Sequence, residues 1–247
     1  MKLTTLLLTS LCVAASGFAQ TTKNFAIDPK PRDEGWMKRH ESFNEISKKG
    51  EAQLVFLGDS ITQGWEKNGK EVWDKTWAPL KAANFGIGGD RTEHVIWRLQ
   101  NGNFDGIKPK LVVLMIGTNN TGHQGRAAAE HGGAVYSSSP EQTAEGVKMI
   151  LDILAKKQPQ AKVLLLGIFP RGATKDDPKR VQNVATNNII SGFGDNKRVF
   201  YMDIGNTFLK PDGTLPQEIM PDLLHLNPAG YQMWADAIEG KVKELMK

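Results

Sequence analysis

The chain has 247 residues, of which 40% are hydrophobic and 23% charged, and this composition is typical of one soluble domain with a substantial core. The net charge is only +4, and no long Lys/Arg run is interleaved with aromatic residues. These features argue against a nucleic-acid-binding surface, although the isoelectric point is near 9.

The first residues have the three parts of a secretory signal peptide. Met1-Lys2 is positively charged, Leu3 to Ala15 is apolar, and Gly17-Phe18-Ala19 has the small-x-small pattern of a cleavage site. The alternative, a membrane anchor, would need roughly 20 apolar residues. We therefore expect a signal peptide over 1–19 and a secreted or periplasmic chain, with no membrane insertion after cleavage. The only cysteine, Cys12, lies in this segment, so the mature chain would contain no disulfide, zinc–cysteine site or thiol nucleophile.

Residues 20–50 are expected to form a polar lead-in and one helix. The apolar spacing within Trp36 to Ser47 predicts a weakly amphipathic helix that Gly50 ends. Residues 51–247 would form the main domain. It begins with the apolar run Leu54 to Leu57, which predicts a strand buried on both faces and is followed by Gly58-Asp59-Ser60. Those three residues also form ordinary turns, but ligands of open α/β sheets bind where such strands end.

The next segment, Trp65 to Leu80, carries three tryptophans, which we interpret as core residues rather than a ligand platform. A short strand, Ala83 to Phe85, then leads into glycine-rich Gly86 to Asp90 and a helix over Thr92 to Leu99. A glycine loop in this position can present N–H groups to an anion. A dinucleotide fingerprint would need glycine where Arg91 stands, so that interpretation is not favoured.

The strand predicted over Lys110 to Ile116 ends in the polar turn Gly117-Thr118-Asn119-Asn120. A long segment, 121–139, follows, and we expect it to be a loop at the rim or a lid of the site, because loops of this length are usually functional or disordered. It contains His123 and His131. We interpret both as residues of a solvated loop rather than metal ligands, since no further ligand stands at a suitable spacing.

Two more strands and two more helices complete the pattern before the final segment. Helices are predicted from Pro140 to Gln158 and from Lys179 to Ile190, and strands over Lys162 to Gly167 and Arg198 to Asp203. Five apolar strands separated by helices predict an α/β fold. We expect a single-domain three-layer α/β/α sandwich around a five-stranded parallel, doubly wound, flavodoxin-like sheet.

The last motif pairs a carboxylate with an imidazole. Asp222 and His225 are three residues apart, a spacing at which the carboxylate can bond to Nδ1 and leave Nε2 free. A helix predicted from Pro228 to Met246 follows. The pair can therefore fold back over the sheet edge that bears Ser60.

Four motifs in this order resemble those of the SGNH (GDSL-type) hydrolases: Gly58-Asp59-Ser60, the Gly-Gly-Asp of 88–90, Gly117-x-Asn119 and Asp222-x-x-His225. The stretches Asn84 to Leu99, 107–110 and 117–120 are most similar to the catalytic subunits of the intracellular platelet-activating factor acetylhydrolases. The resemblance extends from about Glu51 to the C-terminus.

The resemblance implies a serine esterase that acts through an acyl-enzyme. Ser60 matches the nucleophile, His225 the base and Asp222 its orienting partner. The Ser60 and Gly89 N–H groups and the Asn119 side chain match the oxyanion donors. No metal or organic cofactor is implied. Ile61 stands where the motif's name has leucine, a volume-conserving change.

We therefore expect a secreted esterase that removes short acyl groups, acetyl above all, from carbohydrate. Its partner would be a small-molecule or polysaccharide ester. One alternative is a lipid-directed esterase, such as a phospholipid acetylhydrolase or a lysophospholipase-like enzyme. Another is a non-catalytic carbohydrate-binding module on the same fold, which would not need to retain all five candidate residues.

Overall fold

A computed structural model describes residues 23–247, so the expected signal peptide over 1–19 lies outside the described residues. The central sheet has five parallel strands in the order β2-β1-β3-β6-β7. Counted along the chain, this is the flavodoxin-like order 2-1-3-4-5, as predicted. The strands are β1 (Leu54–Gly58), β2 (Ala82–Gly86), β3 (Leu111–Met115), β6 (Lys162–Leu166) and β7 (Val199–Met202).

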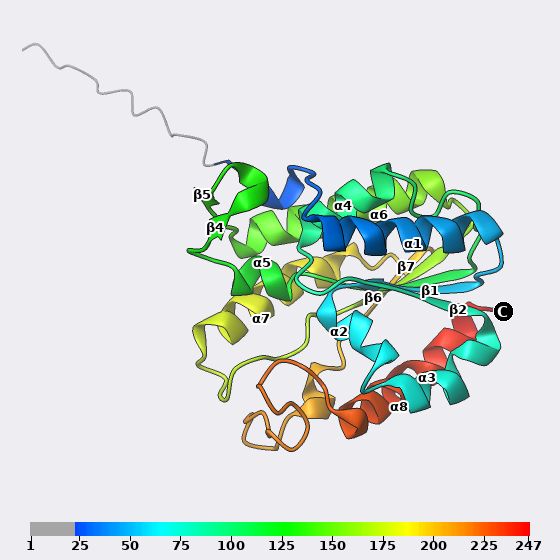
Figure 1. Ribbon diagram of the computed structural model, residues 1–247. Coiled ribbons are helices and arrows are strands. Elements are labelled where there is room, and N and C mark those ends of the chain that lie inside the picture. Colours follow the sequence, from blue (N-terminus) through cyan, green and yellow to red (C-terminus); the bar gives the residue numbers. More distant parts are fainter. Residues whose placement is uncertain (1–22) are drawn as a thin grey trace, which may run out of the picture.

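Helices cover both faces of the sheet (Figure 1). One layer contains α1, α4, α6 and α7, and the other contains α2, α3 and α8. This confirms the α/β/α sandwich. The helices are α1 (Glu34–Lys49), α2 (Ser60–Gln63), α3 (Lys70–Thr76), α4 (Thr92–Gln100), α5 (Thr118–Gly122), α6 (Pro140–Lys157), α7 (Pro178–Ile190) and α8 (Pro228–Leu245), with short 3-10 turns at η1 (Phe25–Ile27), η2 (Gly64–Glu66), η3 (Ala78–Leu80), η4 (Ala129–His131), η5 (Ser191–Phe193) and η6 (Gly205–Phe208).

The alternation of side chains along each strand explains why the strands are apolar throughout. In β1, Val55 and Leu57 pack into the core beneath α1, α4 and α6, whereas Leu54 and Phe56 pack into the core beneath α3 and α8. Every residue of β1 is buried. A strand covered on both faces has no solvent face to mark with polar residues, and this is why the sequence shows an unbroken apolar run.

The tryptophans of the Trp65–Leu80 segment pack in the core, as predicted. Trp65 and Trp77 are 1% and 0% exposed, and Trp73 is partly buried against the same cluster. The Trp65 ring lies 4.7 Å from that of Tyr231 and 4.9 Å from that of Trp234, both in α8. This aromatic cluster joins α8 to the segment that follows β1.

The segment 121–139 differs from the expected loop. It contains a two-stranded antiparallel hairpin, β4 (Ala127–Ala128) with β5 (Ala134–Val135). We call residues 125–136 the β4–β5 hairpin. Tyr136, its last residue, is fully buried and packs beside Phe25 of the lead-in.

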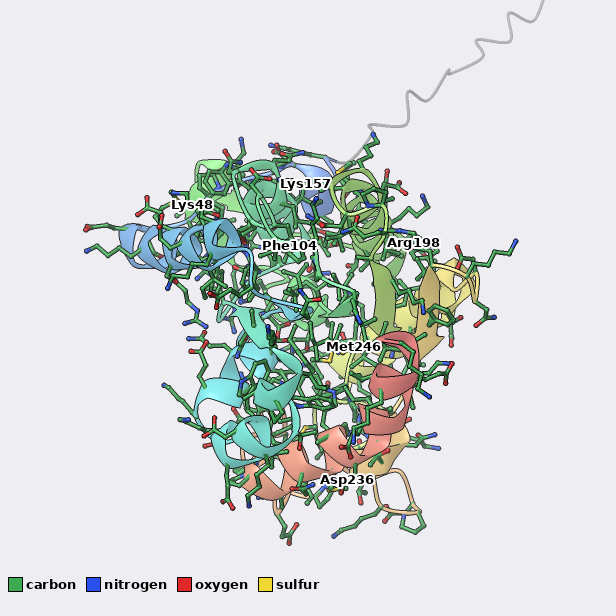
Figure 2. The ribbon with its side chains drawn as sticks, turned by 90° about the vertical axis from the view of Figure 1, so that its right-hand side faces the viewer. Lys48, Phe104, Lys157, Arg198, Asp236 and Met246 are labelled. Carbon is green, nitrogen blue, oxygen red and sulfur yellow. The ribbon has the colours of Figure 1, made fainter. Side chains whose placement is uncertain are left out.

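The candidate site residues lie at only one of the two ends of the sheet. Figure 2 shows the end at which chain segments enter the strands, and its labels Lys48, Phe104, Lys157 and Arg198 all precede strands. The candidate site residues follow strands and lie at the other end. Within residues 23–247, no helix has both the length and the apolar character needed to cross a bilayer.

Candidate active site

Ser60 lies at the carboxyl end of β1 as the first residue of the one-turn helix α2. The turn that carries it leaves no room for a side chain at Gly58, because a Cβ there would lie 2.3 Å from Thr62 Oγ1 and 2.4 Å from the Met115 carbonyl. The Asp59 carboxylate caps the helix by accepting the Ile61 N–H at 3.0 Å. A close-packed glycine and an acidic cap thus place the Ser60 hydroxyl above the sheet edge.

Ser60, His225 and Asp222 form a continuous hydrogen-bonded chain. The Ser60 Oγ lies 2.8 Å from His225 Nε2, and His225 Nδ1 lies 2.6 Å from Asp222 Oδ2. Because a carboxylate can only accept, Nδ1 carries the ring proton and the neutral Nε2 accepts from the Ser60 hydroxyl. The structure therefore brings together three side chains that the sequence placed up to 165 residues apart.

The Asp222 carboxylate is fixed by local hydrogen bonds. Its Oδ1 accepts the backbone N–H groups of His225 at 2.7 Å and Leu224 at 3.1 Å. Partial burial opposes ionisation, but the hydrogen bonds from the His225 ring and backbone outweigh it and hold the pKa of Asp222 below its ordinary value. Asp222 therefore stays ionised at neutral pH and can stabilise an imidazolium that forms during a reaction.

The loop that carries Asp222 and His225 is tied to its surroundings on both sides. The Gly172 N–H donates to the Leu223 carbonyl at 3.0 Å, and Leu223 itself has φ 58°. After the loop, the Asn227 side chain caps α8 by accepting the Gly230 N–H at 2.9 Å. Asn68 also donates to the Leu226 carbonyl at 2.9 Å. These contacts set the direction from which the imidazole approaches Ser60.

Gly89 and Asn119 follow β2 and β3, the two strands on either side of β1, at the same edge of the sheet. The Asn119 side-chain amide donates one N–H to the Asp90 carbonyl at 3.0 Å, and its second N–H is left for another acceptor. Gly89 has φ 77°, a left-handed conformation that glycine adopts without strain. Among residues 23–247, no acceptor is bonded to the N–H groups of Ser60 and Gly89.

Contacts on both sides hold the Gly88–Gly89 turn in place. Gln63 accepts the Gly88 N–H at 2.7 Å, and Arg32 donates to the Gly88 carbonyl at 2.7 Å. Behind the turn, the fully buried Asp90 accepts from Trp36 Nε1 at 2.6 Å and pairs with the buried Arg98 at 2.9 Å. Arg32 has no local sequence pattern that marks it, because only the tertiary fold brings the lead-in beside this turn.

Asp59 is a buried carboxylate next to Ser60. Burial, and to a smaller extent the charge of Asp90, raises the pKa of Asp59 to about 7 despite its hydrogen bond from Ile61. Its Oδ2 has no hydrogen-bond partner within the described chain. The sequence motif contained this residue but gave no indication that its protonation would be unusual.

His131 is not part of a solvated loop, so that prediction is wrong. Its side chain is 0% exposed, and its ring lies 4.8 Å from that of Phe25. His123 is half-buried and accepts a 2.9 Å hydrogen bond from Arg91. The cause is the β4–β5 hairpin, which packs against the lead-in and α4 and so covers both rings.

Arg91 is the centre of the polar cluster beneath the hairpin. Its guanidinium bonds to Glu93 at 2.5 Å, to Glu130 and to His123, and lies 4.0 Å from the Tyr136 ring centroid. Glu93, His94 and Glu130 offer ligand atoms within 4.8 Å of one another, the spacing of a metal site. In this structure the Arg91 guanidinium contacts all three and supplies the positive charge there.

The chain is similar to known proteins over most of its length. The model of the GDSL-like Lipase/Acylhydrolase family matches residues 56–233. The chain is 37% identical over 215 residues to the platelet-activating factor acetylhydrolase IB subunit alpha1 of Bos taurus, covering 87% of this chain and 85% of the relative. It is 34% identical over 216 residues to the alpha2 subunit of Rattus norvegicus, covering 87% and 86%.

Solved structures share the fold at lower identity. A GDSL-like lipase from Bacteroides thetaiotaomicron superimposes with a TM-score of 0.60 and 20% identity, covering 84% of this chain and 97% of the other. An acetylxylan esterase from Geobacillus stearothermophilus superimposes with a TM-score of 0.59 and 18% identity, covering 80% and 96%.

Proposed function

The chain belongs to the GDSL-like Lipase/Acylhydrolase family and is a carboxylic-ester hydrolase, and we propose that Ser60 is the nucleophile of this activity. The observation that carries the proposal is the 2.8 Å contact between Ser60 Oγ and His225 Nε2, backed by Asp222. A serine hydroxyl is a weak nucleophile unless a positioned base removes its proton during attack.

In the first half-reaction, Ser60 Oγ bonds to the ester carbonyl carbon while its proton moves to His225 Nε2. The imidazolium is stabilised by Asp222, and it then protonates the alcohol oxygen as the C–O bond breaks. In the second half-reaction, His225 takes a proton from water, which attacks the acyl-enzyme. Return of the proton to Ser60 Oγ releases the acid. Ser60, His225 and Asp222 thus supply the nucleophile and every proton transfer of both half-reactions.

The negative charge on the carbonyl oxygen would be stabilised by three donors. We assign this role to the N–H groups of Ser60 and Gly89 and to the free N–H of the Asn119 amide. Each donor is fixed before the substrate binds, so little reorganisation is needed as the charge develops. The Asp90 carbonyl supports the proposal by orienting the Asn119 amide.

For the substrate, we infer a short acyl group, acetyl above all, on carbohydrate. The cavity beside Gly89 supports this, because its lining includes Arg32, Arg91, His123 and Arg126 and is therefore polar. A lipid-directed acetylhydrolase is the second candidate, favoured by the identity of 37% to a protein named for platelet-activating factor. Both candidates have a similar protein whose name refers to acetyl esters: one is named for platelet-activating factor, and the other is named an acetylxylan esterase.

We also propose that the protein is exported, on the pattern of residues 1–19. The test is N-terminal sequencing of the protein purified from the native host, with the extracellular, periplasmic and cytoplasmic fractions assayed separately. A mature chain that begins near Gln20 outside the cytoplasm is expected. An intact Met1 on the cytoplasmic protein would contradict export.

Acetate release decides the substrate class. The purified enzyme is assayed on acetylated xylan and acetylated polygalacturonate beside a 2-acetyl phospholipid, with p-nitrophenyl esters of increasing chain length as a third series. We expect release from polysaccharide and a fall in rate as the acyl chain lengthens. Faster release from the phospholipid would favour the lipid-directed enzyme. Ser60→Ala is the control for contaminating esterases.

A further inference from the structure

A small cavity adjoins the Gly88–Gly89 turn and is partly formed by the β4–β5 hairpin. Its volume is about 190 Å³, and the residues that line it include Arg32, Gly89, Arg91, His123, Arg126 and Glu130. Because Gly89 belongs to both the cavity and the proposed oxyanion site, a group bound in the cavity would lie next to the ester carbonyl. The cavity is therefore placed to contact the substrate close to the scissile bond.

The Arg32 guanidinium lies close to Gly89. Its Nη1 and Nη2 atoms lie 3.1 and 3.2 Å from the position that a Cβ on Gly89 would occupy. Its nearest carboxylate, Asp90 at 3.5 Å, is already paired with Arg98 at 2.9 Å. The charge of Arg32 is therefore only partly compensated beside the turn.

Arg126 supplies a second cation from the hairpin. It is exposed, and within residues 23–247 no carboxylate lies within ion-pair distance of its guanidinium. Glu130 is the one carboxylate among the lining residues, and it shares the single positive charge of Arg91 with the buried Glu93. The residues that line the cavity therefore carry the three positive charges of Arg32, Arg91 and Arg126 against the one negative charge of Glu130.

The state of His123 is consistent with this balance. The pKa of His123 is lowered to about 4, mainly by burial and then by the positive charges of Arg91, Arg126 and Arg32. The ring is therefore neutral at physiological pH. Its Nδ1 accepts from Arg91, so its remaining proton lies on Nε2, which is a donor. The cavity thus combines two incompletely paired guanidinium groups with a neutral ring donor.

We propose that this cavity binds a carboxylate on the alcohol half of the ester, so that the preferred substrates are acetylated acidic sugars such as O-acetylated uronosides. The inference rests on the proposed function, because it assigns the substrate class of that same site. Arginine suits this role, since its planar fork of donors matches a carboxylate. The subsite would hold the sugar while Ser60 reacts with its acetyl group.

The test uses two substrates that differ only in the acidic group: mono-O-acetylated methyl glucuronoside and mono-O-acetylated methyl glucoside. For the wild-type enzyme, kcat/KM should be about 10- to 100-fold higher for the uronoside, the range expected for a charge-assisted hydrogen bond. Arg126→Gln should move this ratio toward one, Arg126→Lys should retain most of it, and added salt should reduce it in the wild type.

Lys108→Gln is the matched control, because it removes one positive charge at the opposite end of the sheet, before β3. It should leave the ratio unchanged. Equal kcat/KM for both sugars in the wild-type enzyme would overturn the subsite while leaving the esterase intact. An acid preference that Arg126→Gln does not alter would overturn the assignment to this cavity. Failure to release acetate from either sugar would contradict the proposed function itself.

Discussion

The Tyr231 hydroxyl donates a 2.6 Å hydrogen bond to the Ile61 carbonyl, although 170 residues separate the two. Ile61 follows Ser60 in α2, whereas Tyr231 is in α8, the helix that follows His225. The bond is buried and the packing is close, because a Cβ on Gly64 would lie 1.9 Å from the Tyr231 oxygen. This contact therefore joins the segment of the proposed nucleophile to that of its base.

Tyr231→Phe should lower kcat by several-fold and reduce the free energy of unfolding by about 1 kcal/mol. The substitution keeps the ring in the core but leaves the Ile61 carbonyl unsatisfied. Denaturant unfolding and p-nitrophenyl acetate kinetics provide the two measurements. Tyr201→Phe is a control, because the Tyr201 hydroxyl makes only a long, weak hydrogen bond, 3.5 Å to Asp203. Unaltered kcat in Tyr231→Phe would mean that this bond does not position the site.

Asn119→Ala should reduce kcat by about 10²- to 10³-fold with a smaller effect on KM, because an oxyanion donor acts mainly in the transition state. Steady-state kinetics on p-nitrophenyl acetate measures both constants. Asn188→Ala, on α7 and away from the site, is the matched control. A loss confined to KM would place Asn119 in substrate binding rather than in oxyanion stabilisation.

Asp222→Asn should lower kcat by roughly 10- to 10³-fold, since the amide no longer stabilises an imidazolium. The effect should lie below that of a fully buried carboxylate, because the Asp222 side chain is 57% exposed and water partly replaces it. An unchanged kcat would remove Asp222 from its orienting role.

Asp59 should make the stability of the protein depend on pH. Its pKa is raised to about 7 in the folded chain, so between about pH 4 and 7 the folded state holds a proton that the unfolded state has released. The Asp59 contribution to the free energy of unfolding therefore falls as pH rises through this window and is constant above it.

Asp59→Asn removes this dependence while keeping an oxygen that can cap Ile61. Relative to the wild type, the variant should gain roughly 2 to 4 kcal/mol between pH 4 and pH 8. Urea unfolding at several pH values measures the difference. Any cost of the buried amide is the same at every pH, so the test depends only on how the difference in free energy of unfolding changes with pH. Parallel curves for the two proteins would show that Asp59 ionises in the folded state as it does in the unfolded state.

The sheet could be predicted from sequence because each strand is buried on both faces. The run before Ser60 and the run before Gly117 are apolar without alternation, a pattern that few other elements produce. Ser60, Gly89, Asn119, Asp222 and His225 could be identified because each lies in a short motif. Their meeting follows from parallel strands, whose carboxyl ends share one edge.

The hairpin and its cavity could not be predicted in the same way. Its strands are two residues each, too short for any periodicity, and Ala127 and Ala134 have no strong strand preference. The burial of His131 depends on Phe25, and the position of Arg32 depends on the Gly88 carbonyl. Such contacts between distant segments have no local sequence pattern, so these residues were misplaced or missed.

Covalent labelling tests the role of Ser60 most directly. The enzyme is incubated with diethyl p-nitrophenyl phosphate, which transfers a diethylphosphoryl group to an activated serine, and is then digested and mapped by mass spectrometry. We predict one modified residue, Ser60, with loss of p-nitrophenyl acetate hydrolysis in proportion to labelling. His225→Ala should remain unlabelled, and Ser42→Ala, an exposed serine on α1, should label as the wild type does. Labelling of another serine, or full activity with Ser60 modified, would contradict the assignment.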